Sequence, residues 1–294
     1  MVRKIVSLLL VAGIVSAMVT SCAKKREIVP LSDVTQIEDN KYSCSFDGVD
    51  HDFTLYLPEN TAGAPLVIML HGAGESADVM RRNTGFEEDA VPAGYVVCYV
   101  TGAVDPGNSS YGTGWNSGTA DGENDDCGFL VSLAAYLEDE FKLDTKRTYA
   151  VGFSNGAFMT YRLAVEAPDI FEAVVSCAGY MPLQMWEKKE EKSSVSIFEI
   201  CGENDAAIPK NCDGTAASAI APAIEDVISY WTEADGLEYL GEETVGNSST
   251  LTRYGNNKNI KVWYLYVSGG YHSWPQENIT GIDTNALILE FLEQ

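Results

Sequence analysis

Short apolar segments alternate with helical segments along most of the chain, and this alternation restricts the possible folds more than any other feature. The apolar segments are PLVIMLHG, YVVCYVTG, RTYAVGFS, AVVSCAGY, SVSIFEICG and KVWYLYVSG. Between and after them, GFLVSLAAYLEDEF, GAFMTYRLAVEA, AIEDVISYWTEA and TNALILEFLEQ have the apolar spacing of helices. Strands that alternate with helices form mostly parallel sheets. We therefore predict an α/β fold with a doubly wound, mostly parallel sheet and helices on both faces.

The segment that precedes this alternation predicts a hairpin. Two alternating stretches in SCSFDGVDHDFTLYLP flank Asp47 and Gly48, a pair typical of a tight turn between antiparallel strands. The chain has 294 residues, of which 46% are hydrophobic, enough for one large core. It has neither an internal repeat nor a long linker. We expect a single domain over residues 41–294, with the hairpin at one edge of the sheet.

A GxSxG motif lies where one apolar strand gives way to a helix. In RTYAVGFSNGAFMTYRL, Gly152 and Gly156 flank Ser154. A sharp turn from strand to helix exposes the serine hydroxyl, and the glycines avoid a Cβ clash in that turn. The alternative is a glycine-rich strand exit with a serine that caps the helix. The strand before the motif and the helix after it favour Ser154 as a catalytic nucleophile.

The partners of a nucleophilic serine follow from chain order. In hydrolases with this motif the acid and then the histidine come after the serine. Of the three histidines, only His272 follows Ser154, in the loop VSGGYHSWP. Asp205 directly follows the apolar run in SIFEICGENDAAIP, and Glu203, two residues closer to the strand, is the alternative. We predict a triad of Ser154, Asp205 and His272.

Acyl transfer also needs backbone amides that stabilise the developing oxyanion. The amide of Asn155, directly after the nucleophile, is one candidate. The second is expected in the loop HGAG after the strand VIML, where we favour the amide of Ala73. His71 in this loop is expected to be a structural residue, hydrogen-bonded within the turn. His51, in the predicted hairpin, is expected on the surface.

Six motifs in order now resemble one family: LHGAGES, GWNSG, DDCGFL, GFSNGA, CGENDAAIP and GGYHSWP. They are similar to the polyhydroxybutyrate depolymerase-like esterases, which overlap the feruloyl and acetylxylan esterases of carbohydrate esterase family 1. The resemblance covers residues 42–294. It implies an α/β-hydrolase fold, the triad named above, and a loop beside the acyl pocket that carries Trp115 and Asn116.

Two tryptophans are candidates for substrate binding by this resemblance. Trp115 lies in the glycine-rich stretch YGTGWNSGTADG, and we expect an exposed loop side chain there. It stacks either on an aromatic acyl group or on the enzyme's own surface. Trp274 follows the predicted catalytic histidine. It is either a substrate platform or a residue that packs a lid, and the sequence leaves both open.

Other family positions are interpreted as structural. Asp125 and Asp126 match the acids that begin a helix in the family, where a carboxylate favours the helix dipole. The chain departs from the family at Cys201, where a histidine is usual, and at Cys127, where a valine is usual. These departures leave the triad intact and affect local packing.

The N-terminus has the pattern of a processed export signal. Arg3 and Lys4 precede the apolar run IVSLLLVAGIVSAMV, which ends at VTSC. This tetrad resembles a bacterial lipobox, in which the cysteine is lipidated; an ordinary secretory signal is the alternative. We expect residues 1–21 to be a signal peptide, Cys22 the lipidated residue and residues 22–40 a tether. The expected location is the bacterial cell envelope, at the outer membrane, on its periplasmic or surface face.

The remaining cysteines fit either disulfides or buried thiols. Six are left after Cys22, an even number in an oxidising compartment. Cys201 and Cys212 flank one loop and are the best candidate pair. Cysteines in apolar runs, such as Cys98 and Cys177, also behave as small hydrophobic residues. There is no CxxC pair and no histidine cluster, so we predict neither a metal site nor a cofactor.

The net charge of −24 excludes one class of partner and leaves three functions to compare. An acidic chain without a basic cluster repels polyanions, so nucleic-acid binding is excluded. The first hypothesis is a serine esterase that releases feruloyl or acetyl groups from plant polysaccharide through an acyl-enzyme on Ser154. The alternative is a polyhydroxyalkanoate depolymerase. A non-catalytic glycan-binding protein is the third, and the complete serine, aspartate and histidine set argues against it. The expected partners are an esterified polysaccharide or small ester, and a membrane only through the lipid anchor.

Overall fold

A single mixed sheet organises the part of the chain that the structure describes. In this computed structural model, the described residues are 26–105, 112–120, 122–190, 194–208 and 221–293. The predicted signal peptide and the lipidated Cys22 lie outside them. Among the described residues the sheet has eleven strands in the order β1-β2-β3-β5-β4-β6-β7-β8-β11-β10-β9.

The strands and helices follow the alternation in the sequence. The strands are β1 Ser32–Gln36, β2 Lys41–Phe46, β3 Val49–Tyr56, β4 Leu66–Leu70, β5 Val96–Thr101, β6 Thr148–Phe153, β7 Ala173–Cys177, β8 Ser196–Gly202, β9 Glu238–Val245, β10 Ser249–Gly255 and β11 Lys261–Val267. The helices are α1 Ala77–Thr84, α2 Phe86–Ala90, α3 Asp126–Phe141, α4 Asn155–Glu166, α5 Leu183–Lys188, α7 Ile224–Ala234, α8 Glu277–Thr280 and α9 Thr284–Leu292.

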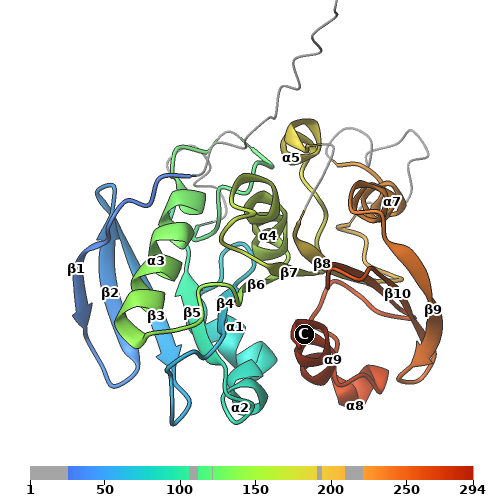
Figure 1. The fold of residues 1–294 in the computed structure, drawn as a ribbon, viewed down its shortest axis with the longest axis horizontal. Coiled ribbons are helices and arrows are strands. Elements are labelled where there is room, and N and C mark those ends of the chain that lie inside the picture. The colour runs from blue at the N-terminus through green and yellow to red at the C-terminus, as the bar shows by residue number, and fades with distance from the viewer. Residues whose placement is uncertain (1–25, 106–111, 121, 191–193, 209–220, 294) are drawn as a thin grey trace, which may run out of the picture.

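The centre of the sheet is parallel and its two edges are antiparallel. Strands β5, β4, β6, β7, β8 and β11 pair in parallel, whereas β1 to β3 and β9 to β10 extend the sheet with antiparallel pairs. Helices α3, α4 and α7 cover one face, and α1, α2 and α9 cover the other (Figure 1). Every residue of β4, β7 and β8 is buried, as expected for strands covered on both faces. The predicted doubly wound α/β fold is confirmed.

The predicted hairpin is confirmed, but the expected position of His51 is wrong. Asp47 and Gly48 join β2 to β3 with φ of 49° and 78°, the positive values that a two-residue hairpin turn requires. Alternate residues of a strand share a face, and His51 lies on the same face as the buried Phe53. The imidazole is 4% exposed and stacks on Phe129 with ring centroids 3.6 Å apart. Burial lowers the pKa of His51 to about 4.

Part of the segment expected to be a tether belongs to the sheet. Within residues 22–40, β1 pairs with β2. Arg26 also forms ion pairs with Asp125 and Glu166, which lie at the start of α3 and the end of α4. The low apolar content of this segment hides the strand, because β1 is an edge strand with four of its five residues exposed.

Most cysteines in the described ranges are buried and unreactive. Cys44, Cys98, Cys127 and Cys177 are buried thiols that form no disulfide. Burial raises the pKa of both Cys44 and Cys127 to about 12, which keeps these thiols protonated. Cys212 lies outside the described residues, so its expected pairing with Cys201 remains a prediction.

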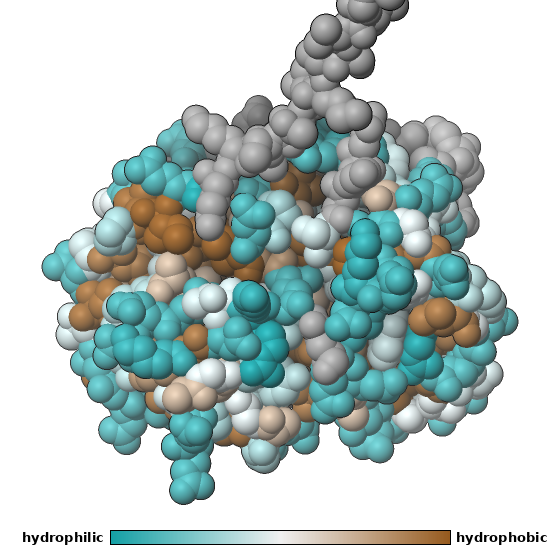
Figure 2. Space-filling view, in the orientation of Figure 1, coloured by the Kyte–Doolittle hydropathy of each residue, from teal (hydrophilic) through white to brown (hydrophobic). Residues whose placement is uncertain are grey.

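One face of the molecule is mostly polar. Hydrophilic side chains cover most of the face seen in Figure 2, with smaller apolar areas between them. A search of the described helices finds none with the length and hydropathy that crossing a bilayer requires.

Candidate active site

Ser154 sits in a strained turn between β6 and α4. Its φ of 52° and ψ of −115° are rare for a residue with a side chain. Two backbone hydrogen bonds hold the turn: the Ser154 amide donates to the Cys177 carbonyl at 3.0 Å, and the Phe158 amide donates to the Ser154 carbonyl at 3.0 Å. The turn places the serine beyond the carboxyl end of β6, where ligands bind in open α/β sheets.

The two glycines of the motif are required by close backbone packing. A Cβ on Gly152 would lie 2.2 Å from the Gly156 carbonyl oxygen, and a Cβ on Gly156 would lie 2.2 Å from that of Leu70. No side chain fits at either distance. Helix α4 can therefore lie directly against β4 and β6, and its first residue reaches the edge where the serine is exposed.

The structure brings the three predicted triad residues together. His272 Nε2 lies 2.9 Å from Ser154 Oγ, and His272 Nδ1 lies 2.8 Å from Asp205 Oδ2. The Asp205 side chain is fully buried just after β8, and its Oδ1 accepts the Ala207 amide at 2.9 Å. The carboxylate beside Nδ1 favours the tautomer that carries the proton there, which leaves Nε2 to accept the serine proton.

The alternative acid, Glu203, supports the histidine loop from a different position. Its exposed carboxylate accepts the Gly269 amide at 2.7 Å and the Ser268 hydroxyl at 3.2 Å. This loop also runs close to β8, because a Cβ on Gly202 would lie 2.7 Å from the Tyr271 carbonyl oxygen. Glu203 thus fixes the backbone that precedes His272, whereas the carboxylate that accepts the hydrogen bond from the imidazole is that of Asp205.

His71 fixes the loop expected to supply an oxyanion donor, as its structural interpretation predicts. Its Nε2 accepts the Gly102 amide at 2.9 Å, so Nδ1 carries the proton and donates to the Gly72 carbonyl at 2.6 Å. The imidazole is completely buried, and burial lowers its pKa to about 4. His71 is therefore neutral at physiological pH and serves as a fixed bridge between the ends of β4 and β5.

Within the described residues, the two amides expected to form an oxyanion hole have no backbone acceptor. In this loop the Gly72 amide donates to Glu75 Oε2 at 3.0 Å, and the Gly74 amide donates to the Thr113 carbonyl at 2.7 Å. Between them, the Ala73 amide meets no acceptor among the described residues. Asn155 is the first residue of α4, so its amide has no acceptor inside the helix.

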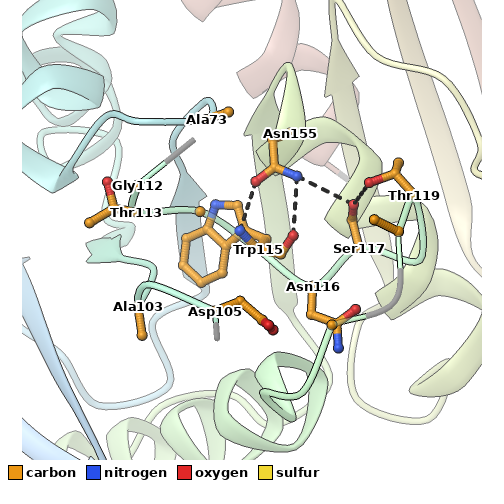
Figure 3. A pocket seen from close by; sticks show the side chains of 13 residues that line it. Ala73, Ala103, Asp105, Gly112, Thr113, Trp115, Asn116, Ser117, Thr119 and Asn155 are labelled. Carbon is orange, nitrogen blue, oxygen red and sulfur yellow. Dashed lines mark hydrogen bonds between the residues drawn. The ribbon is translucent and has the colours of Figure 1, made fainter. Parts of the chain in front are cut away.

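Trp115 is buried, so the expectation of an exposed side chain is wrong. The residue is 4% exposed, and its indole Nε1 donates to the His71 carbonyl at 2.9 Å. The Asn155 side chain holds the Trp115 backbone on both sides: Oδ1 accepts the amide at 2.7 Å, and Nδ2 donates to the carbonyl at 3.1 Å (Figure 3). Of the two roles left open by the sequence, these contacts favour packing of the loop. The side chain of Asn155 is a site feature that the sequence analysis missed.

The neighbouring residues of this loop are also held by the protein. Asn116 donates its backbone amide to Asp126 Oδ2 at 2.6 Å and its side-chain Nδ2 to the Asn124 carbonyl at 2.8 Å. Asp125 caps α3 by accepting the Gly128 amide at 3.0 Å, which confirms its structural interpretation. Burial raises the pKa of Asp126 to about 6. Asn116 and Trp115 line a small cavity of about 40 Å³ that also borders Ala73, room for a few water molecules.

Trp274 also packs inside the protein. It is 6% exposed and belongs to the apolar core between the sheet and α9. Its indole contributes to the walls of two clefts, one on each side of the histidine loop. These contacts favour the lid-packing interpretation over an open substrate platform.

A buried carboxyl group below the site escaped the sequence analysis. Glu199 lies in the middle of β8 with no exposed surface, and its Oε2 accepts the Tyr161 hydroxyl at 2.8 Å. Burial raises the pKa of Glu199 to about 8, so the group is mostly neutral at pH 7. The sequence feature that could have indicated this group is a glutamate inside the otherwise apolar run SIFEICG.

A serine, an aspartate and a histidine in this chain order, at the carboxyl ends of parallel strands, are the arrangement of the α/β-hydrolases. Comparison with known proteins places the chain more closely. A sequence profile of the family described as esterase PHB depolymerase matches residues 51–208. The chain belongs to this family.

Curated relatives of the chain are named as esterases. It is 29% identical to NocK, classed as an esterase, from Nocardia uniformis subsp. tsuyamanensis, over 74% of the chain and 67% of the relative. It is 30% identical to a bifunctional acetylxylan esterase/xylanase of Neocallimastix patriciarum, over 54% of the chain, and 29% identical to feruloyl esterase B of Thermothelomyces thermophilus, over 51%. The matches span only 22% and 48% of these last two proteins.

Solved structures show the same fold. An acetyl xylan esterase from Aspergillus awamori matches with a TM-score of 0.57 over 80% of the chain and 94% of that protein, at 12% sequence identity. The likeness extends to the architecture of the sheet and its helices.

Proposed function

We propose that this protein is a serine carboxylic ester hydrolase that works through an acyl-enzyme on Ser154. The observation that carries the proposal is the continuous hydrogen-bonded path from Ser154 Oγ through His272 to Asp205, with distances of 2.9 and 2.8 Å. Separations of this size allow direct proton transfer between serine and imidazole.

In the proposed mechanism, Ser154 Oγ attacks the ester carbonyl while its proton passes to His272 Nε2. The buried Asp205 carboxylate stabilises the imidazolium that forms. The amides of Ala73 and Asn155 donate to the carbonyl oxygen as it becomes an oxyanion. His272 then returns the proton to the departing alcohol, and a water molecule hydrolyses the acyl-enzyme by the reverse sequence.

The proposed substrates are feruloyl or acetyl esters of plant polysaccharide. Support comes from the relatives named as acetylxylan and feruloyl esterases. The family name supports the alternative, a depolymerase of polyhydroxyalkanoate chains, which uses the same triad. A non-catalytic glycan-binding protein has no need of the aligned proton path or of a strained serine at φ 52°.

A hydrolysis panel tests the function and its substrate class. The purified protein is given methyl ferulate, acetylated xylan and a hydroxybutyrate oligomer, and released acid is measured. We expect turnover of the ferulate or the xylan ester to exceed that of the oligomer. Faster release from the oligomer would establish the depolymerase instead. Absence of turnover on all three, and on p-nitrophenyl acetate, would refute the esterase.

We further propose that the protein is exported and anchored by a lipid at Cys22. Support comes from the basic, apolar and VTSC order of the N-terminus. Cys22→Ser is expected to abolish lipid attachment, because the thiol is the site of acylation. Intact mass measurement of the membrane fraction checks this. A mature protein without diacylglycerol would contradict the proposal.

A further inference from the structure

A cleft of about 540 Å³ opens directly beside His272. Helix α1 and the turn before it form one wall, with Glu75, Arg82 and Asn83, and the loop that carries His272 and Ser273 forms the other. We call this the α1 cleft. A hydrogen bond of 3.0 Å from Gln276 Nε2 to the Asn83 carbonyl joins the two walls.

The chemistry of the proposed function assigns the α1 cleft to the alcohol part of the ester. When the acyl-enzyme forms, the bond between Ser154 Oγ and the acyl carbon is made and the bond from that carbon to the alcohol oxygen breaks. The proton that left Oγ moves from His272 Nε2 to this alcohol oxygen. The departing alcohol must therefore lie within hydrogen-bond reach of His272, which lines the α1 cleft.

Four polar side chains that line the α1 cleft each keep a hydrogen-bonding group without a partner in the described part of the chain. Glu75 gives one oxygen, Oε2, to the Gly72 amide, but its Oε1 meets no donor among the described residues. Arg82 is exposed and has no acidic partner in the described ranges, although the chain has 43 acids and 19 bases. The Asn83 side chain and the Ser273 hydroxyl are likewise without hydrogen-bond partners in those ranges.

The same cleft has an apolar surface close to these groups. Met80 and Phe153 both line it, and the Phe153 ring lies 5.4 Å from the imidazole of His272. Sugars combine hydroxyl groups, which both donate and accept, with apolar C–H faces. Glu75 is half-buried, and a carboxylate oxygen only accepts, so the free Oε1 offers an acceptor to a ligand hydroxyl. The interior of a polyester chain offers carbonyl acceptors and no donors.

We infer that the α1 cleft is a subsite for a saccharide as the alcohol part of the substrate, an inference that rests on the proposed esterase function. Arg82 and Asn83 donate hydrogen bonds to sugar oxygens, and Glu75 Oε1 accepts one from a sugar hydroxyl. The ring of Phe153 packs on an apolar C–H face of the sugar. The subsite favours glycosyl esters over polyester chains.

Two acetate esters that differ only in their alcohol isolate this subsite. We compare kcat/KM for acetylated xylobiose and for ethyl acetate in the wild type and in Arg82→Met, which keeps much of the apolar stem. The ratio of the two values is expected to fall about ten-fold, the loss of one charge-assisted hydrogen bond. Ser273→Ala, which loses a neutral hydroxyl, is expected to lower the ratio less.

Lys258→Met is the matched control for charge. Lys258 is an exposed cation in the turn before the amino end of β11, whereas His272 follows the carboxyl end of the same strand. Its loss changes the net charge as Arg82→Met does, so the ratio is expected to stay constant. An equal loss on both esters in Arg82→Met, or an equal fall of the ratio in Lys258→Met, would overturn the saccharide subsite.

A binding measurement separates failure of the subsite from failure of the esterase. Titration of Ser154→Ala with acetylated xylobiose in a calorimeter is expected to give a dissociation constant that Arg82→Met raises about ten-fold in the same background. If the wild type hydrolyses no ester but this difference persists, the proposed esterase is refuted, and with it the role of the α1 cleft as a leaving-group subsite; the cleft then stands as a saccharide-binding site alone. If both esters are hydrolysed but Arg82→Met leaves binding unchanged, the subsite is refuted and the esterase stands.

Discussion

Ser154→Ala is expected to lower kcat for every ester substrate by at least about 10⁴-fold while the protein stays folded. The hydroxyl oxygen is the atom that forms the acyl bond, and the 2.9 Å contact with His272 Nε2 gives its proton a path away. Alanine keeps the Cβ at the strained φ of 52°, and both backbone hydrogen bonds of the turn remain. The thermal midpoint should therefore change little. Initial rates with p-nitrophenyl acetate and a thermal melt measure the two effects.

Ser132→Ala is the matched control for this variant. Ser132 is a buried serine in α3, away from the triad. Its substitution also removes a serine hydroxyl but leaves the hydrogen-bonded path from Ser154 to Asp205 intact. It is expected to keep wild-type rates. If Ser154→Ala kept more than a tenth of the wild-type activity, the assignment of the nucleophile would be wrong.

The meeting of the triad could be predicted because each residue lies in the turn or loop that follows a strand. Ser154 and His272 are 118 residues apart in the chain, yet both come after an apolar run that reads as a buried parallel strand. Parallel strands end at the same edge of the sheet, so the residues that follow them converge there. Asp205 follows β8, next to β11, which leads to the histidine loop. Local sequence patterns were enough to predict the triad, because the parallel sheet brings together residues that are far apart in the chain.

The burial of loop and edge residues could not be predicted in this way. Glycine-rich composition marks a turn around Trp115 but does not reveal which surface covers it. The partners that bury it, the His71 carbonyl and the Asn155 side chain, are 44 and 40 residues away in the chain. Strand β9 was missed for a related reason. None of the residues in β9 is buried, so the apolar alternation that marks a strand is weak there.

Trp115→Ala is expected to destabilise the protein by about 3–5 kcal/mol and to slow all esters by a similar factor. Removal of the indole leaves a cavity in the core and leaves the buried His71 carbonyl without its donor at 2.9 Å. The loop of residues 71–74, which carries the Ala73 amide, then loses its support. A displaced oxyanion donor costs up to about 10²-fold in rate, whatever the acyl group. Denaturant unfolding and kcat on methyl ferulate and p-nitrophenyl acetate give the two quantities.

Trp263→Ala separates the support of the oxyanion loop from the general cost of losing a core tryptophan. Trp263 is 6% exposed in β11 and packs on Phe198 and Phe291 in the core on the other face of the sheet. Its removal is expected to cost a comparable amount of stability but to leave kcat near the wild-type value, because it contacts neither His71 nor Asn155. Selective loss on the ferulate ester in Trp115→Ala, with stability unchanged, would instead restore Trp115 as a substrate platform. Equal losses on both esters together with lower stability would assign it to the support of the oxyanion loop.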